Sequence, residues 1–324
     1  MQRYTFFLFV LVIINLPQLL AQPSRSATAS SYLERGKKFF ERGDLDRALG
    51  DFDLAVATDP NMSIAYYNRG LVHFQKMEME YALADFNRAL QLNPKLIEAY
   101  TNRGLIQLSQ NNFDEARKDF TKVIELNPRS LFGWNNRGMI FLEQQNWQAA
   151  LSDFNRALEI DGKSVEALVG RGVAWQLKGD FALAIKDHTK AIALNPQHAA
   201  AWGARGIERQ HLGDWDGALS DYDQAIKLKL DYAISWFNRG AAYFAQGELV
   251  KAEADLTHAL ELDPNSTDTL AVRGLVRLKL GKPTEAQADF DRCLQINPKL
   301  KAELELLKTE NQTKSTTHGS GIKN

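Results

Sequence analysis

Apolar and polar side chains follow one another along most of this chain in a pattern that repeats every 34 residues. An Arg-Gly pair marks the period and recurs eight times without insertion or deletion, with its glycine at Gly36, Gly70, Gly104, Gly138, Gly172, Gly206, Gly240 and Gly274. If this glycine is called position 8, the units begin at residues 29, 63, 97, 131, 165, 199, 233 and 267. A fixed period of this length is typical of proteins made of stacked supersecondary units.

Within each unit the apolar side chains fall on two helical stripes. The first stripe combines positions 4, 8 and 11, with a large apolar residue such as Tyr66 or Trp134 at position 4. The second combines positions 20, 24 and 27, where position 20 is always alanine and position 24 is mostly aromatic, as in Phe86. A turn sequence such as Gly179-Asp180 separates the stripes. Proline at position 32 ends the second helix in six units, because it cannot donate to the preceding turn. The pattern therefore predicts eight helical hairpins.

Each unit also places two charged residues within its apolar stripes. Position 7 is arginine and position 23 is aspartate in all eight units. Because an unpaired charge is costly to bury, we expect each arginine to pair with the aspartate across its own helix pair. Anion binding by a row of arginines is the alternative interpretation.

The aromatic, glycine, alanine and proline positions together resemble the motif of the tetratricopeptide repeat (TPR) family, at the same period. The resemblance extends over residues 29–298. It implies an all-α fold, a right-handed superhelical α-solenoid of eight TPR helical hairpins in which the first helices line a concave face. It also implies a protein that binds peptides or other proteins.

The first 21 residues differ from the repeats and resemble a secretory signal peptide. Arg3 gives a short positive start, Phe6–Ile14 is an unbroken apolar run, and a cut ahead of Gln22 follows small or apolar residues. The run is short for a helix that crosses a membrane, which needs roughly 20 apolar residues. We therefore expect an exported protein, either secreted or periplasmic. An uncleaved segment that tethers the protein to a membrane is the alternative.

The remaining segments outside the repeats have simple expected roles. Residues 22–28 are rich in serine and alanine and are interpreted as a linker. Residues 299–312 include an amphipathic stretch that is expected to form a helix capping the last hairpin. Residues 313–324 are polar and are expected to be disordered.

Composition and motifs argue against several functional classes. The formal net charge is −1 and the basic residues are spread along the chain, whereas nucleic-acid binders show a clustered basic face. None of the six histidines has a spacing typical of metal sites, and no Walker A loop, dinucleotide glycine pattern or CxxC pair occurs. Too few residues lie outside the repeats for a catalytic domain. We expect no enzyme activity, no cofactor, no metal and no small-molecule substrate.

Three kinds of unusual residue have structural interpretations. His188 replaces an aromatic residue at position 24, and Cys293 replaces alanine at position 27, so both are expected in the core. All six tryptophans fall at positions 4, 11 or 17. Packing is therefore favoured over a sugar-binding platform for them.

The family resemblance places candidate ligand-binding residues at positions 5, 6 and 9 of the first helices. Position 6 is asparagine in four units, position 9 is mostly apolar, and position 5 is aromatic in some units. The candidate peptide-binding residues are Asn68, Asn102, Asn136, Asn238, Leu71, Leu105, Met139, Tyr67 and Phe237. Asparagine carries a donor and an acceptor, so a row of asparagines can bond an extended peptide's backbone. An apolar floor with polar groups suits an extended or helical peptide.

One alternative to this site stays open. The asparagines can instead bond neighbouring helices, with position 9 partly in the core. The carboxylate clamp of chaperone-binding TPR proteins is not expected, because Leu33 and Lys37 stand where its lysine and asparagine would be. The sequence thus predicts an exported, non-enzymatic scaffold that binds a peptide or protein partner in a concave groove. The alternative is a structural subunit of an assembly, held by its convex face or its ends.

Overall fold

The computed structural model describes residues 27–307 and 309, and all regular secondary structure in that part of the chain is helical. The chain divides into two compact units, with the boundary after Gly162. The expected signal peptide (1–21) and tail (313–324) lie outside the described residues, as do residues 22–26 of the expected linker and residue 308 and residues 310–312 of the expected capping helix.

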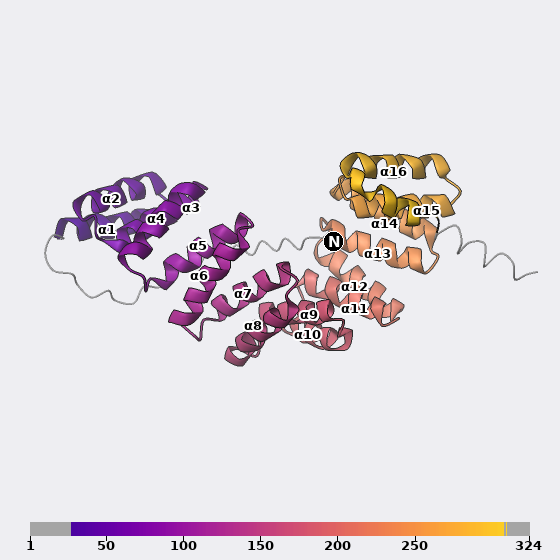
Figure 1. Cartoon of the computed structure of the whole chain (residues 1–324), viewed down its shortest axis with the longest axis horizontal. Helices are drawn as coiled ribbons and strands as arrows, with labels where there is room; N and C mark the ends of the chain where they lie inside the picture. Colours follow the sequence, from indigo (N-terminus) through magenta and orange to yellow (C-terminus); the bar gives the residue numbers. More distant parts are fainter. Residues whose placement is uncertain (1–26, 308, 310–324) are drawn as a thin grey trace, which may run out of the picture. The chain divides into compact units, whose positions relative to one another are not determined.

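The first unit consists of four helical hairpins that follow one another along the chain (Figure 1). Its helices are α1 (Ala27–Glu41), α2 (Leu45–Thr58), α3 (Ser63–Gln75), α4 (Met79–Leu92), α5 (Ile97–Ser109), α6 (Phe113–Leu126), α7 (Leu131–Glu143) and α8 (Trp147–Ile160). Each second helix contacts both its own first helix and the first helix of the next hairpin within the unit.

The second unit repeats this arrangement. Its helices are α9 (Val165–Lys178), α10 (Phe181–Leu194), α11 (Ala199–His211), α12 (Trp215–Leu228), α13 (Ala233–Ala245), α14 (Leu249–Leu262), α15 (Thr267–Lys279) and α16 (Pro283–Ile296). A short 3₁₀ helix, η1 (Pro298–Leu300), follows, and residues 301–307 are helical. Leu304 from this last stretch is buried in one cluster with Phe290 and Cys293. The apolar side of the stretch therefore covers the last hairpin.

Helix boundaries follow the period of the sequence. From α3 onward every first helix begins at position 1 of its unit, and every second helix runs from position 17 to position 30. The exception is α1, which begins at Ala27, inside the segment interpreted as a linker. No glycine or proline interrupts the chain between Ala27 and Gly36, so nothing in this segment prevents the helix from starting earlier.

The turn between the two helices of each hairpin uses a left-handed backbone at position 15. Five hairpins place glycine there, and the other three place Met77, Asn111 and Gln145 at φ values of 62°, 60° and 56°. Glycine adopts this region freely, whereas other residues are strained in it. Three turns of the first unit therefore keep the common geometry against the preference of their side chains.

A close approach inside each hairpin explains the glycine at position 8. A Cβ atom added at Gly70 would lie 2.8 Å from Cε1 of Phe86, and one added at Gly206 would lie 2.5 Å from Cε1 of Tyr222. Both distances are too short for real carbon atoms. The aromatic ring at position 24 therefore packs directly on the backbone of the first helix.

The expected pairing of arginine with aspartate is confirmed in all eight hairpins. In each case Nε and Nη2 of the arginine donate to the two carboxylate oxygens of the aspartate sixteen residues later, as in Arg137–Asp153 with both distances at 2.8 Å. Side-chain exposure is 9–26% for seven of the arginines, but 56% for Arg35 in the first hairpin. The bidentate pairs neutralise charges that would otherwise be buried alone.

The same arginines also connect neighbouring hairpins. Nη1 donates to the side chain sixteen residues earlier, at position 25 of the preceding hairpin, as in Arg69 to Asp53 at 2.7 Å and Arg205 to Thr189 at 3.1 Å. Four further junctions within the units repeat this bond, to Asn87, Thr121, Asp223 and Thr257. Each of these six arginines therefore ties its own hairpin together and binds it to the one before within the same unit.

Candidate peptide-binding surface

The nine candidate residues lie on the first helices of four hairpins. Seven of them belong to the first unit, where Tyr67, Asn68 and Leu71 lie on α3, Asn102 and Leu105 on α5, and Asn136 and Met139 on α7. Phe237 and Asn238 lie on α13 of the second unit. We call the seven residues on α3, α5 and α7 the first-helix surface.

The asparagines of the first-helix surface bond mainly to their own helices. Nδ2 of Asn68 donates to the carbonyl oxygen of Ile64 at 2.7 Å, and Asn102 and Asn136 make the same bond four residues back, at 3.0 and 2.9 Å. A carbonyl oxygen only accepts, so the amide nitrogen must face it and the orientation of each amide is fixed. One contact runs between hairpins, since Nδ2 of Asn102 also donates to the Tyr67 hydroxyl at 3.1 Å.

Tyr67 is the most enclosed residue of the set. Its ring is buried, with its centroid 5.8 Å from that of Phe86. Burial raises the pKa of the phenol well above its ordinary value, and the charge of Glu98 adds to this, so the hydroxyl stays protonated. The hydroxyl accepts from Asn102 and keeps its own hydrogen for an acceptor.

The apolar candidates are shared between the surface and the core. Leu71 and Leu105 are half-buried and pack against the clusters that contain Phe86 and Phe120, respectively. Phe237 packs in the same way against a cluster with Leu256, and Met139 is half-buried. Both sequence interpretations of position 9 therefore apply to the same side chains, because one edge packs and the other remains accessible.

The tryptophans at position 4 have internal partners. The indole nitrogens of Trp134, Trp202 and Trp236 each donate at 2.9 Å to the backbone carbonyl six residues earlier, in the segment that joins two hairpins. Each of these rings also lies under the guanidinium of the arginine at position 7, 4.9–5.0 Å from the ring centroid. These contacts account for the three rings structurally.

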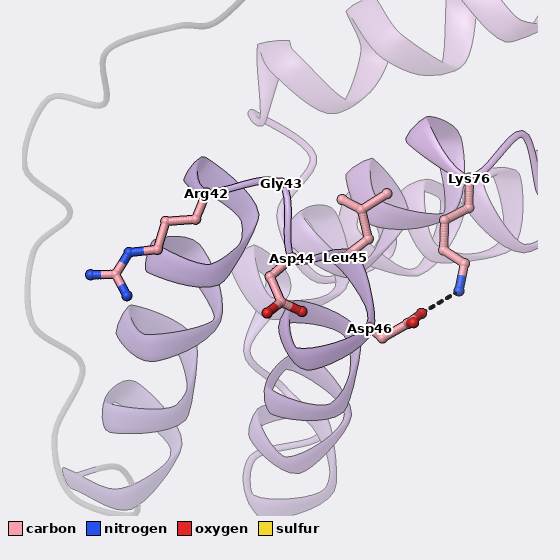
Figure 2. Close-up of a pocket in the computed structure, with 6 residues that line it drawn as sticks. All are labelled: Arg42, Gly43, Asp44, Leu45, Asp46 and Lys76. Carbon is pink, nitrogen blue, oxygen red and sulfur yellow. Dashed lines mark hydrogen bonds and ion pairs between the residues drawn. The ribbon is translucent and has the colours of Figure 1, made fainter.

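A depression of about 550 Å³ lies away from the candidate residues, at the turn between α1 and α2. Figure 2 shows the residues that line it: Arg42, Gly43, Asp44, Leu45, Asp46 and Lys76. Lys76 Nζ lies 2.9 Å from Oδ1 of Asp46, whose side chain is largely exposed. The depression is open to solvent, and Lys76, Asp46 and Asp44 among its lining residues form ion pairs at the surface, which gives it no chemistry beyond that of a turn.

The described residues offer neither a metal site nor a membrane-spanning helix. Within 27–307 and 309, no three histidine, cysteine or carboxylate side chains gather in a way that could bind a metal ion. The helices of this part of the chain are all too short or too polar to span a bilayer.

The buried pair His188–Glu208 is the feature that sequence reasoning missed. His188 is expected in the core from its position in the repeat, and it is fully buried. Its partner was not recognised, although position 10 offered the evidence. Six of the eight units have an aliphatic residue at that position, whereas the unit that begins at residue 199 has Glu208 there.

An all-α solenoid of 34-residue helical hairpins is the class of protein that this fold defines. Comparison with protein families agrees. A model described as tetratricopeptide repeat matches residues 63–96, 97–130, 132–164 and 233–266, and a second with the same description matches residues 267–300. A model described as TPR repeat matches residues 211–247. Together the matches cover more than half of the chain, which belongs to the tetratricopeptide repeat family.

Solved structures show the same fold at low sequence identity. A tetratricopeptide repeat protein from Parabacteroides merdae is 21% identical, with 77% of this chain and 98% of that chain covered and a TM-score of 0.62. A chain of the APC/C hetero-tetramer Cut9-Hcn1 is 20% identical, with 88% of this chain and 56% of that chain covered and a TM-score of 0.65. The structure of Pseudomonas aeruginosa pilF is 18% identical in sequence, with 65% of this chain and 96% of that chain covered and a TM-score of 0.55. No curated protein matches the sequence.

Family membership indicates a general function. TPR proteins are generally non-catalytic scaffolds that bind peptides or other proteins, so the repeats indicate a protein–protein interaction scaffold. The partner and its binding site are not determined by the fold, because one fold serves many functions.

Proposed function

We propose that this protein is an exported, non-enzymatic scaffold that binds an extended peptide segment of a partner protein on its first-helix surface. The observation that carries the proposal is the row of asparagines on α3, α5 and α7 with the same amide orientation. The apolar side chains of Leu71, Leu105 and Met139 accompany this row, each three residues after the asparagine of its helix.

The orientation of the amides favours an extended segment over a helical one. Each Nδ2 atom is engaged by its own helix, which leaves the Oδ1 oxygens of Asn102 and Asn136 to accept from a ligand. An extended peptide has backbone N–H groups free to donate, whereas most N–H groups of a helix are already bonded internally. Asn68 and Tyr67 are almost fully buried, so Asn102 and Asn136 carry most of the proposed contact.

The N-terminal sequence supports export. Arg3, the apolar run Phe6–Ile14 and the small or apolar residues before Gln22 have the layout of a signal peptide. N-terminal sequencing of the mature protein tests this part. A chain that begins at Gln22 supports export and cleavage, whereas a mature chain that retains Met1 contradicts cleavage.

Partner binding is tested with matched amide substitutions. The variant Asn102→Leu/Asn136→Leu removes two amides from the first-helix surface, and Gln91→Leu/Gln148→Leu removes two exposed amides from second helices. Partners of the full-length protein are crosslinked and identified, and affinity is then measured for each variant. We expect weaker binding only for the asparagine variant, after circular dichroism shows that both variants fold.

Other results would contradict the proposed site. Unchanged binding by the asparagine variant, with loss in the glutamine variant, would move the partner to the second helices. That result is what a subunit held by its convex face requires. Recovery of no protein partner under gentle crosslinking would argue against a binding scaffold altogether.

A further inference from the structure

Junctions between neighbouring hairpins have a common apolar centre. Within each unit, the side chain at position 24 of one hairpin shares a core cluster with position 10 of the next hairpin. Five junctions follow this rule, with the pairs Phe52–Val72, Phe86–Ile106, Phe120–Ile140, Tyr222–Ala242 and Leu256–Val276. At the junction of α10 with α11, the corresponding residues are His188 and Glu208.

This polar pair is completely enclosed. His188 and Glu208 both have 0% exposure. Nδ1 of His188 lies 2.8 Å from Oε1 and 2.9 Å from Oε2 of Glu208, while Nε2 lies 3.3 Å from the backbone carbonyl oxygen of Val169 on α9. The ring packs on Gly172, where an added Cβ would come within 2.5 Å of Nε2. Both ring nitrogens therefore face acceptor oxygens.

The contacts determine how many protons the pair holds. The Val169 carbonyl only accepts, so Nε2 must carry a hydrogen. Between Nδ1 and the carboxyl group, one proton lies either on the nitrogen or on the oxygen. In either form the pair holds two protons and has no net charge. Loss of one proton would leave a buried negative charge, which is costly.

Neighbouring charged groups are paired among themselves. On α9 and α10, Arg171 binds Asp187. On α11 and α12, Asp221 binds both Arg205 and Arg209. Burial raises the pKa of Glu208, and the hydrogen bond from His188 opposes this shift; the charges of Asp221 and Arg205 act in opposite directions.

His198, at the start of α11, also lies near the pair, and the carboxylate of Glu166 on α9 lies near His198. His198 accepts from the backbone N–H of Ala201, and burial lowers its pKa, so it is neutral at pH 7 and above. No surrounding group therefore offers a free charge to compensate a deprotonated pair at neutral or higher pH.

We propose that His188 and Glu208 form a pH-responsive joint between the hairpins α9–α10 and α11–α12, closed while the pair keeps both protons and loosened when rising pH removes one. This proposal does not depend on the function proposed above. It assigns to one junction of the second unit a property that the apolar junctions lack.

The direction in which pH shifts the opening equilibrium follows from the number of protons that the pair holds in each form. A histidine exposed to water has a pKa of about 6.5, and an exposed glutamate has a pKa of about 4.3. Between these values the opened and closed forms both hold two protons, so their equilibrium does not respond to pH through this pair. Above about pH 6.5 the opened form holds one proton fewer. The opening equilibrium constant then rises by up to tenfold per pH unit, until the closed pair also loses its proton.

Amide hydrogen exchange measures this opening directly in the full chain. Exchange in α10 and α11 is followed between pH 6.0 and 8.5 and corrected for the intrinsic pH dependence of exchange. For the wild type we expect opening constants that rise with pH in α10 and α11. The apolar junction of α4 with α5 should show no such rise and serves as the internal control.

Two variants test whether the pair is responsible. Glu208→Gln keeps a neutral hydrogen bond to His188 but removes the titrating carboxyl group. His188→Phe/Glu208→Ile installs the side chains found at Phe120 and Ile140. Both variants should abolish the rise. His258→Gln removes a histidine whose ion pair with Glu261 is exposed, and should leave the rise unchanged.

The proposal would be overturned by a wild-type opening constant at α10 and α11 that is independent of pH above 6.5. It would also be overturned by the same rise in either pair variant. Should Glu208→Gln fail to fold, the apolar double variant decides the question alone. An equal rise at the α4–α5 junction would show a general effect of pH and would contradict a local joint.

Discussion

Replacement of Asp153 by alanine should destabilise the first unit strongly. Asp153 is buried and accepts both bidentate bonds from Arg137, whose side chain is 18% exposed. Loss of one partner from a buried ion pair costs about 3–5 kcal/mol, because the other charge is left without compensation. Arg137 would keep its bond to Thr121 and its contact with the ring of Trp134, so we expect about 3 kcal/mol, at the lower end of that range.

The first hairpin supplies a matched control. Asp51 occupies the same position 23 and makes the same two bonds, but its partner Arg35 is 56% exposed. Without Asp51, Arg35 can turn its charge to water, so Asp51→Ala should cost much less than Asp153→Ala. A further variant, Arg137→Met/Asp153→Leu, removes both charges at once and should recover much of the stability lost in Asp153→Ala.

The assay is thermal unfolding followed by circular dichroism at pH 7, with urea unfolding as a second measure. For a unit of this size, 1 kcal/mol corresponds to roughly 2–4 °C, so Asp153→Ala should lower the melting temperature of the first unit by roughly 6–12 °C. Equal losses in Asp51→Ala and Asp153→Ala would refute the reasoning, because burial of the arginine would then not matter. Failure of the double variant to recover stability would refute the assignment of the loss to an unpaired charge.

Three other predictions follow from single features. Asn111→Gly should raise stability by up to about 1 kcal/mol in urea unfolding, since glycine adopts the left-handed turn without strain; a loss would contradict that. Leu304→Ala should cost about 2–5 kcal/mol and speed hydrogen exchange in α16, because Leu304 is buried against the last hairpin; unchanged exchange would show that residues 301–307 do not cap it. Burial lowers the pKa of His198, which accepts the Ala201 N–H while neutral. The contribution of this hydrogen bond to stability is present above about pH 6.5 and is lost as pH falls through the lowered pKa. Asparagine at this N-cap position does not titrate. In urea unfolding, the His198→Asn variant should therefore lose less stability toward acid pH than the wild type.

The repeated architecture could be predicted because the chain contains eight versions of the same unit. Comparison of the units with one another identified the helices, the turns and the arginine–aspartate pairs without any homologue. The glycine at position 8 belongs to the same repeated pattern, whereas its contact with the ring at position 24, as between Gly70 and Phe86, is known only from the structure.

The details that escaped prediction are those in which one unit departs from the others. Glu208 becomes meaningful only when the contact between position 24 and position 10 of the next hairpin is known, and that contact is a matter of packing. The direction of the Asn68 amide is similar, since an amide can bond its own helix, a neighbouring helix or a ligand. Periodicity alone does not choose among these partners.

The arginine at position 7 has a consequence for how such a chain can change in length. Its two acceptor residues lie sixteen residues ahead and sixteen residues behind, so all three bonds of Arg69 are contained within 33 consecutive residues. Duplication of a whole 34-residue segment inside one unit would therefore bring a complete set of donors and acceptors with it. A gene encoding this protein could gain or lose hairpins in whole steps while the guanidinium groups at the junctions keep both acceptors, whereas an insertion within a helix that shifts its register would turn donors or acceptors away from the faces that meet.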